Sequence, residues 1–237
     1  MVINLARSLM FELLRFVLTV IFSVVALLTF PLSSMRRYQI ITLWSHCITF
    51  LAKYICGIKY RVEGLENIPD NPCVILSKHQ SAWETFAFQT IFPPQVWVLK
   101  KSLLYVPFFG WGLAMMNPIA IDRSSGPRAL KQMRTQGINR IKNGWYIIVF
   151  PEGTRIAPGK RGSYQIGGAW LSAQLQSDIV PVAHNAGEYW PKNALLKKPG
   201  TITVTIGKPI KTAHQSPADL TKQVEDWIET TISHSYP

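Results

Sequence analysis

The feature that most constrains this fold is a long uncharged segment near the N-terminus. No charged residue occurs in residues 16–35, and the run FVLTVIFSVVALLTF is almost wholly apolar. About 20 apolar residues in a helix are enough to cross the hydrocarbon core of a bilayer. A second apolar stretch, residues 40–58, carries His46 and Lys53 and is therefore a weaker spanning candidate.

Three interpretations of this N-terminal region compete. A cleaved signal peptide is disfavoured because no small-x-small cleavage site follows the apolar run. The other two are a helical hairpin that crosses the bilayer and a hairpin that lies partly in one leaflet with its basic residues on the headgroups. Arg7 and Arg15 precede the first run and Arg36 and Arg37 follow it, so charge leaves the orientation ambiguous. We expect residues 1–58 to form a two-helix membrane anchor, whose depth stays open.

The charge balance restricts the classes of partner. Lys and Arg outnumber Asp and Glu by 25 to 13, a net charge of +12, which favours anionic lipid, nucleic acid or phosphorylated small molecules. No RNP-like or helix-turn-helix pattern supports nucleic acid. The three cysteines show no CxxC spacing, which indicates free thiols in a reducing compartment and no zinc site.

The rest of the chain, residues 59–237, has the pattern of an α/β domain. Short β-rich runs alternate with helical stretches, which predicts a mixed sheet flanked by helices. The expected strands are residues 73–77, 95–99, 117–121, 145–150, 179–183 and 201–206, and the expected helices are residues 127–142, residues 165–177 and a C-terminal helix that begins near Ser216.

The first candidate site lies directly after the expected strand 73–77. His79 and Glu84 provide a base and a carboxylate that can orient it. Five helical residues turn through about 500°, so the two side chains meet only if His79 lies in the turn before a helix and Glu84 in its first turn. A helix N-terminus beside His79 disfavours imidazolium and keeps a neutral base. Taken alone, the pattern is more typical of a structural histidine.

Further candidates follow two other expected strands. FPEGTR at 150–155 stands where α/β sheets build their sites. Arg155 can hold a phosphate through two parallel hydrogen bonds, and Gly153 lets backbone approach a ligand. Arg123 is a second candidate anion ligand, which Asp122 could orient. In both places a plain turn with a surface ion pair is the alternative.

Two lysines and a proline complete the set of candidates. Lys100 and Lys101 stand shortly before the apolar segment 107–111, and that pairing suits a phosphorylated headgroup attached to an acyl chain. Pro181 interrupts an apolar run, which indicates an edge or irregular strand.

Four of these blocks together resemble a known family. KHQSAWE, NPIAIDR, FPEGTR and IVPVA, in this order, are similar to the four sequence blocks of the glycerolipid acyltransferase family, and more narrowly to its bacterial members that acylate 1-acyl-glycerol 3-phosphate. The similarity covers roughly residues 60–210, and the N-terminal hairpin also suits that family. Four blocks in order are much more specific than any one.

The resemblance implies a role for each block. It implies that His79 is the catalytic base, with Glu84 in place of the family's Asp and Lys78 where an Asn often precedes the histidine. The remaining implied residues bind substrate. The acceptor's phosphate is bound by Arg123, Lys100 and Lys101, although Ser102 stands where a Glu is common, and the same site is shaped by Glu152, Gly153, Thr154 and Arg155. The resemblance also implies that Pro181 lies near the acyl-donor or catalytic cleft.

The implied reaction moves an acyl group from acyl-CoA or acyl-carrier protein to the free hydroxyl of lysophosphatidic acid, giving phosphatidic acid for phospholipid synthesis. It needs no metal, no bound cofactor and no acyl-enzyme. The implied partners are membrane lipids and these substrates, not nucleic acid, and the implied location is the bacterial inner membrane with the catalytic domain on the cytoplasmic side.

Two alternatives remain from the sequence. The acceptor could be another lysolipid or glycerol 3-phosphate, or the chain could be a non-catalytic membrane protein that binds anionic lipid. The sequence has no G-x-S-x-G elbow, which argues against a serine hydrolase.

Overall fold

A seven-stranded sheet with helices on both faces organises the chain in this computed structural model, which describes residues 2–122 and 125–235. The strands are β1 (Ile58–Glu63), β2 (Val74–Ser77), β3 (Gln95–Lys100), β4 (Ile119–Ile121), β5 (Tyr146–Val149), β6 (Ile179–His184) and β7 (Gly200–Ile206). The helices are α1 (Val2–Leu28), α2 (Ser34–Ile41), α3 (Leu43–Cys56), η1 (Leu65–Asn67), α4 (Trp83–Ile91), η2 (Lys101–Tyr105), α5 (Phe109–Met115), α6 (Pro127–Lys142), α7 (Gly167–Leu175), α8 (Ala186–Tyr189) and α9 (Pro217–Ser235).

The strand order is β1-β7-β6-β2-β5-β3-β4, and β6 with β7 is the one antiparallel pair among the described strands. The predicted mixed sheet is therefore confirmed. Parallel neighbours end at the same edge of a sheet, so the segments that follow β2, β3, β5 and β6 meet there, which is where open α/β sheets bind ligands.

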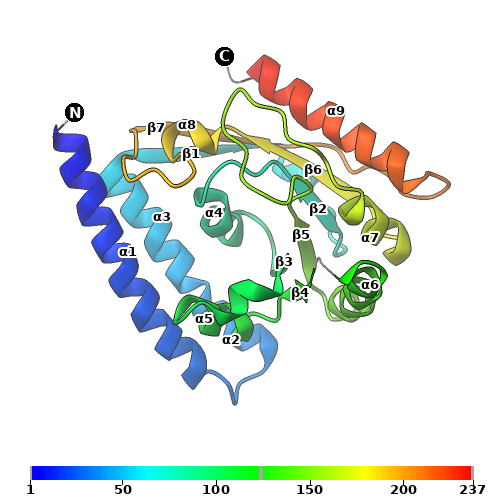
Figure 1. Ribbon diagram of the computed structural model, residues 1–237, viewed down its shortest axis with the longest axis horizontal. Helices are drawn as coiled ribbons and strands as arrows, with labels where there is room; N and C mark the ends of the chain where they lie inside the picture. The colour runs from blue at the N-terminus through cyan, green and yellow to red at the C-terminus, as the bar shows by residue number, and fades with distance from the viewer. Residues whose placement is uncertain (1, 123–124, 236–237) are drawn as a thin grey trace.

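Alternating side chains of the strands fill a core on each face of the sheet. In β2, Ile75 packs in the cluster that includes residues of α1, α3 and α4, whereas Val74 and Leu76 pack in the cluster that includes residues of α6, α7 and α9. Figure 1 shows these two helical layers on either side of the strands. The period of two along a strand explains why these short apolar runs are buried on both faces.

The interior position of β6 corrects one expectation. Pro181 indicated an edge or irregular strand, but β6 lies between β7 and β2. The antiparallel ladder with β7 covers only Val182 to His184, so the N–H that Pro181 lacks falls outside that ladder.

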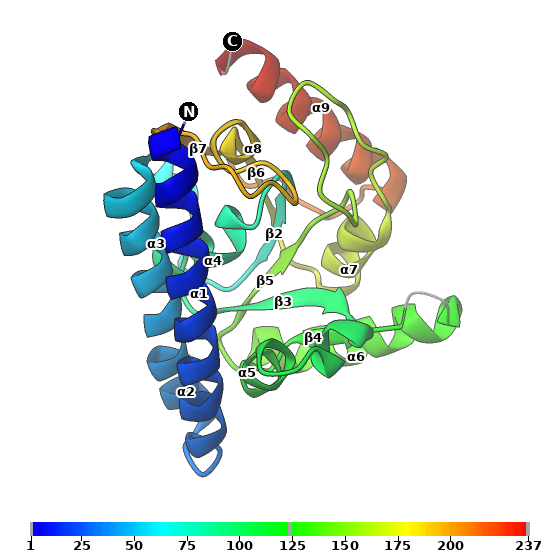
Figure 2. The ribbon, with the colours of Figure 1, turned by 60° about the vertical axis from the view of Figure 1, so that its left-hand side comes forward.

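The N-terminal segment packs against the sheet's own core. The first apolar run forms α1, and the second is divided at Thr42 into α2 and α3, the latter ending at Gly57 in the left-handed conformation. Figure 2 shows α1 running along one side of the molecule, where it contacts α3 and α5. Among the described helices, only α1 is long and apolar enough to cross a membrane. Division of the chain at residue 58 stays a prediction.

Two phenylalanines on α1, one buried and one exposed, allow the contribution of the helix's buried face to stability to be tested. Phe11 is 0% exposed and packs edge-on against Trp190, with ring centroids 5.0 Å apart. We expect Phe11→Ala to lower the free energy of unfolding by about 3–5 kcal/mol, because it removes a buried ring. Phe16 is 61% exposed, so Phe16→Ala is the matched control. Denaturant unfolding of both variants in one detergent gives the comparison, and equal losses would contradict the packing role.

Candidate active site

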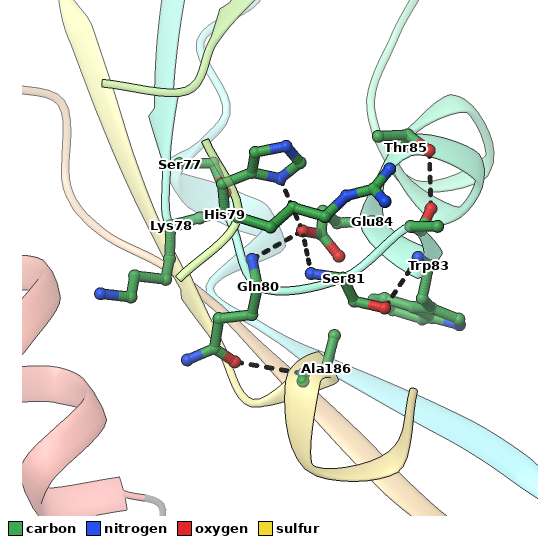
Figure 3. Close-up of polar contacts among 12 residues, drawn as sticks. Ser77, Lys78, His79, Gln80, Ser81, Trp83, Glu84, Thr85 and Ala186 are labelled. Atoms are coloured by element: carbon green, nitrogen blue, oxygen red, sulfur yellow. Dashed lines mark hydrogen bonds and ion pairs between the residues drawn. The ribbon is translucent and has the colours of Figure 1, made fainter. Parts of the chain in front are cut away.

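His79 and Glu84 meet across the turn between β2 and α4. Nδ1 of His79 lies 2.8 Å from Oε1 of Glu84 (Figure 3). Because α4 begins at Trp83, Glu84 lies in its first turn and His79 in the turn before it, which is the arrangement that their spacing requires. A carboxylate only accepts hydrogen bonds, so Nδ1 donates and Nε2 keeps its lone pair. The imidazole is oriented as a base.

The carboxylate of Glu84 is fully buried and strongly hydrogen-bonded at one oxygen. Besides His79, Oε1 accepts the backbone N–H groups of Gln80 at 2.9 Å and Ser81 at 2.8 Å. Burial raises the pKa of Glu84, but the hydrogen bonds that Oε1 accepts from His79 and from the backbone N–H of Ser81 oppose this, and the pKa lies below its ordinary value. Glu84 therefore remains ionised and can stabilise an imidazolium beside it.

Residues that follow β5 hold both the ring and the backbone of His79. The imidazole stacks on Phe150 with centroids 3.9 Å apart and planes inclined by 9°. The N–H of His79 donates to Oε2 of Glu152 at 2.9 Å, and its carbonyl accepts the N–H of Ile156 at 2.8 Å. The position of the base thus depends on a segment more than seventy residues away, which β2–β5 pairing brings alongside.

A second histidine supports the same turn from β6. Nδ1 of His184 accepts the N–H of Ala186 at 3.2 Å, so Nε2 carries the proton and donates to the carbonyl of Lys78 at 2.9 Å. The ring is 0% exposed. Burial lowers the pKa of His184, although the charge of Glu84 opposes this. His184 is therefore a neutral donor that fixes the backbone immediately before His79.

His79 stands at the wall of an apolar cavity of about 390 Å³. Lys100 and Arg155 bring positive charge to its lining, and Gly153 also lines it. The rest of the lining comes from α1, α2, α3, α4, β3, η2 and α5, and from single residues after α5 and β5: Thr19, Phe22, Ser23, Ile41, Trp44, Thr85, Phe86, Gln89, Trp97, Val98, Leu99, Leu103, Phe109, Gly112, Leu113, Met116 and Phe150. An imidazole and a guanidinium at the wall of a mostly apolar cavity can receive a polar group attached to a hydrocarbon chain.

Several predicted site residues lie away from this cavity. Lys101 and Thr154 are exposed and do not line it, and the hydroxyl of Thr154 accepts a hydrogen bond from Lys192 at 3.3 Å. Glu152 is buried and contacts His79 and Lys78 instead. The expectation for Arg123 lies outside the described residues.

Pro181 lines a different groove. It lies beside Gly207 and Trp227, beneath α9, and is not among the described residues of the cavity at His79. In the part of the chain that the structure describes, no group of three or more His, Cys, Asp or Glu residues could hold a metal ion.

Sequence reasoning missed three contributors to the site. The side chain of Lys78 and the ring of His184 support the turn from inside the fold, and α1 supplies Thr19, Phe22 and Ser23 to the cavity. For His184 a signal exists, since it is the first polar residue after the IVPVA block. For Lys78 and α1, nothing local in the sequence indicates these positions.

Comparison with known proteins shows the family of the chain. Residues 59–185 match the family model described as Acyltransferase. The chain is 43% identical over 236 residues to a 1-acyl-sn-glycerol-3-phosphate acyltransferase of Pseudomonas aeruginosa, covering 98% of this chain and 92% of that protein. It is 31% identical to a Saccharomyces cerevisiae protein of the same name, covering 79% of this chain and 64% of that protein.

A solved structure shares the fold. The crystal structure of the 1-acyl-sn-glycerophosphate acyltransferase of Thermotoga maritima superposes with a TM-score of 0.81, covering 98% of this chain and 95% of that one. At 24% sequence identity, the likeness concerns the fold.

The neutral state of His184 predicts a pH dependence of stability. Because its pKa in the folded protein lies below the ordinary value of 6.5, the unfolded chain binds more protons as pH falls from about 7 towards 5, and the free energy of unfolding decreases. We expect His184→Gln, which retains an N–H donor but does not titrate, to show a shallower decrease than wild type. Melting temperatures across this range test it, and equal slopes would contradict it.

Proposed function

The chain belongs to the acyltransferase family, and on that premise we propose that it transfers a fatty acyl group from a thioester donor to the free hydroxyl of 1-acyl-glycerol 3-phosphate. The observation that carries the proposal is the His79–Glu84 pair at the wall of an apolar cavity that also holds Arg155. The relatives named for this same reaction support the choice of acceptor.

The geometry supports a direct transfer. Nε2 of His79 takes the proton of the acceptor hydroxyl while its oxygen attacks the thioester carbonyl, and Glu84 stabilises the imidazolium that forms. The tetrahedral intermediate collapses with cleavage of the carbon–sulfur bond. The leaving thiolate takes the proton from the imidazolium, so the enzyme returns to its starting state. The transfer draws on no bound cofactor, and the donor is acyl-CoA or acyl-carrier protein.

Substrate binding follows from the division of the cavity into polar and apolar parts. Arg155 and Lys100 hold the phosphate near His79, and the apolar lining receives hydrocarbon. In this proposal Arg123 contributes a further charge to the phosphate. Holding the headgroup beside the base places the hydroxyl for attack, so the step is effectively unimolecular once both substrates are bound.

We further propose that α1 associates the enzyme with the bacterial inner membrane, with the catalytic domain on the cytoplasmic side, and that the phosphatidic acid formed enters phospholipid synthesis. Two features of α1 support membrane association. The helix is long and apolar enough to cross a bilayer, and many of its large apolar side chains are exposed.

Loss of the base should abolish turnover. We expect His79→Ala to reduce kcat by about three or more orders of magnitude while the protein remains folded, because general-base assistance of this size disappears. The assay is radiolabelled acyl transfer to lysophosphatidic acid with acyl-CoA and, separately, acyl-carrier protein. His46→Ala, on an exposed residue of α3 outside the cavity, is the control. Retained turnover by purified His79→Ala would refute the assignment of the base.

Removal of the guanidinium should act on acceptor binding. We expect Arg155→Ala to raise the KM for lysophosphatidic acid about tenfold or more, the usual worth of a charge-assisted contact, with a smaller change in kcat. Arg161→Ala, at an exposed position outside the cavity, should leave KM unchanged. An unaltered acceptor KM in Arg155→Ala would exclude the phosphate-binding role. Glycerol 3-phosphate and other lysolipids as acceptors test the specificity.

A further inference from the structure

Lys78 is a lysine buried directly beside the proposed base. Its side chain is 1% exposed and points away from His79 and Glu84, as Figure 3 shows. Nζ lies 2.7 Å from Oε1 of Glu152 and 2.7 Å from Oε1 of Glu229 on α9. Burying an ammonium is costly unless carboxylates compensate it, and here two do.

The two carboxylates connect the ammonium to opposite parts of the molecule. Glu152 uses its second oxygen to accept the N–H of His79 at 2.9 Å. Glu229 accepts the hydroxyl of Tyr164 at 2.8 Å, so its orientation is fixed from the segment that precedes α7. A continuous chain of contacts therefore runs from α9 through Lys78 and Glu152 to the backbone of His79.

Burial raises the pKa of Glu152, and the hydrogen bond and charge of Lys78 oppose this increase. Only the ionised carboxylate has both oxygens available as acceptors, one for the ammonium and one for the backbone N–H. Without Lys78, nothing from this side would oppose the effect of burial, so protonation of Glu152 would become easier, and a neutral carboxyl would hold the N–H of His79 more weakly than a carboxylate does. An apolar residue at position 78 could fill the space but not keep Glu152 ionised.

We propose that Lys78 is a positioning residue: its buried ammonium, held by Glu229 of the C-terminal helix, keeps Glu152 on the backbone N–H of His79 and so fixes the catalytic imidazole. Lys78 touches no substrate, since it does not line the cavity at His79. The C-terminal helix thereby contributes to catalysis from the far side of the sheet. This proposal rests on the proposed function, because its kinetic test measures acyl transfer.

One substitution removes the ammonium of Lys78, and a second substitution on α9 supplies another ammonium in its place. We expect Lys78→Met to lower kcat by about tenfold to a hundredfold, because a catalytic group displaced by about 1 Å costs rate on that order. The KM for lysophosphatidic acid should stay within about threefold, since the phosphate ligands are untouched. Adding Glu229→Lys to Lys78→Met supplies an ammonium from α9 within reach of Glu152, and it should restore much of the lost kcat.

Two milder variants keep the test decisive if Lys78→Met does not fold. Glu229→Gln changes a side chain that is 17% exposed and removes one carboxylate from the ammonium, and we expect a severalfold loss of kcat at unchanged KM. Glu225→Gln is the matched control, because Glu225 lies one turn earlier on α9 and pairs with the surface residue Arg161 at 2.7 Å. Its kcat should equal that of wild type.

A wild-type kcat in folded Lys78→Met, or equal losses in Glu229→Gln and Glu225→Gln, would overturn the proposal. So would equal kcat values for Lys78→Met and the double variant when both are folded, since a structural role alone predicts no rescue.

The imidazole itself provides a readout that does not need turnover. NMR signals of the His79 ring nitrogens, assigned with His79→Ala, should shift in Glu229→Gln and not in Glu225→Gln. If wild type transfers no acyl group to lysophosphatidic acid, the proposed function fails, and these spectra still test the positioning role. If wild type is active but the spectra of Glu229→Gln match those of wild type, the positioning role fails alone.

Discussion

The parallel pairing of β2 with β5 on one side and β6 on the other is the constraint on which the site depends. It brings three segments that are distant in the chain to one edge of the sheet, each carrying a residue that fixes the same turn. His79 follows β2, Glu152 follows β5 and His184 ends β6. A shift of register in either pair would separate His79 from the groups that hold it.

Several independent contacts hold the turn around His79, and a catalytic base would need such preorganisation. Its ring is fixed by Glu84 at Nδ1 and by the face of Phe150, and its backbone is fixed at both N–H and carbonyl. Little reorganisation is left for the moment of reaction. The lone pair on Nε2 is the one part of the ring that these contacts leave available for chemistry.

Local relationships in this chain could be predicted from sequence, and distant ones could not. The His79–Glu84 contact spans five positions within one strand-to-helix turn, so spacing alone determines when the side chains meet. The contact of Glu152 with the backbone of His79 spans 73 positions and exists only because β2 and β5 are neighbours. The family resemblance implied that Glu152 shapes the phosphate site, and the structure adds that its carboxylate contacts Lys78 and the backbone of His79.

Two other features show why residue type alone does not reveal a strand or a buried side chain. β1 was not predicted, because charged residues at Lys59, Arg61 and Glu63 hide a strand whose partner, β7, lies far along the chain. Lysine is almost never fully buried unless paired, so Lys78 gave no sign of its position before its carboxylate partners were located. Both cases depend on tertiary contacts that override local preference.

α1 combines two environments that usually belong to different helices. Its buried face carries Phe11 into the core and Ser23 to the cavity wall, while large apolar side chains such as Phe16 and Val24 remain exposed on the other face. A soluble protein would rarely leave so much apolar surface on one helix. Because the same helix bounds the cavity at His79, its exposed apolar face and the apolar cavity lie on opposite sides of a single helix.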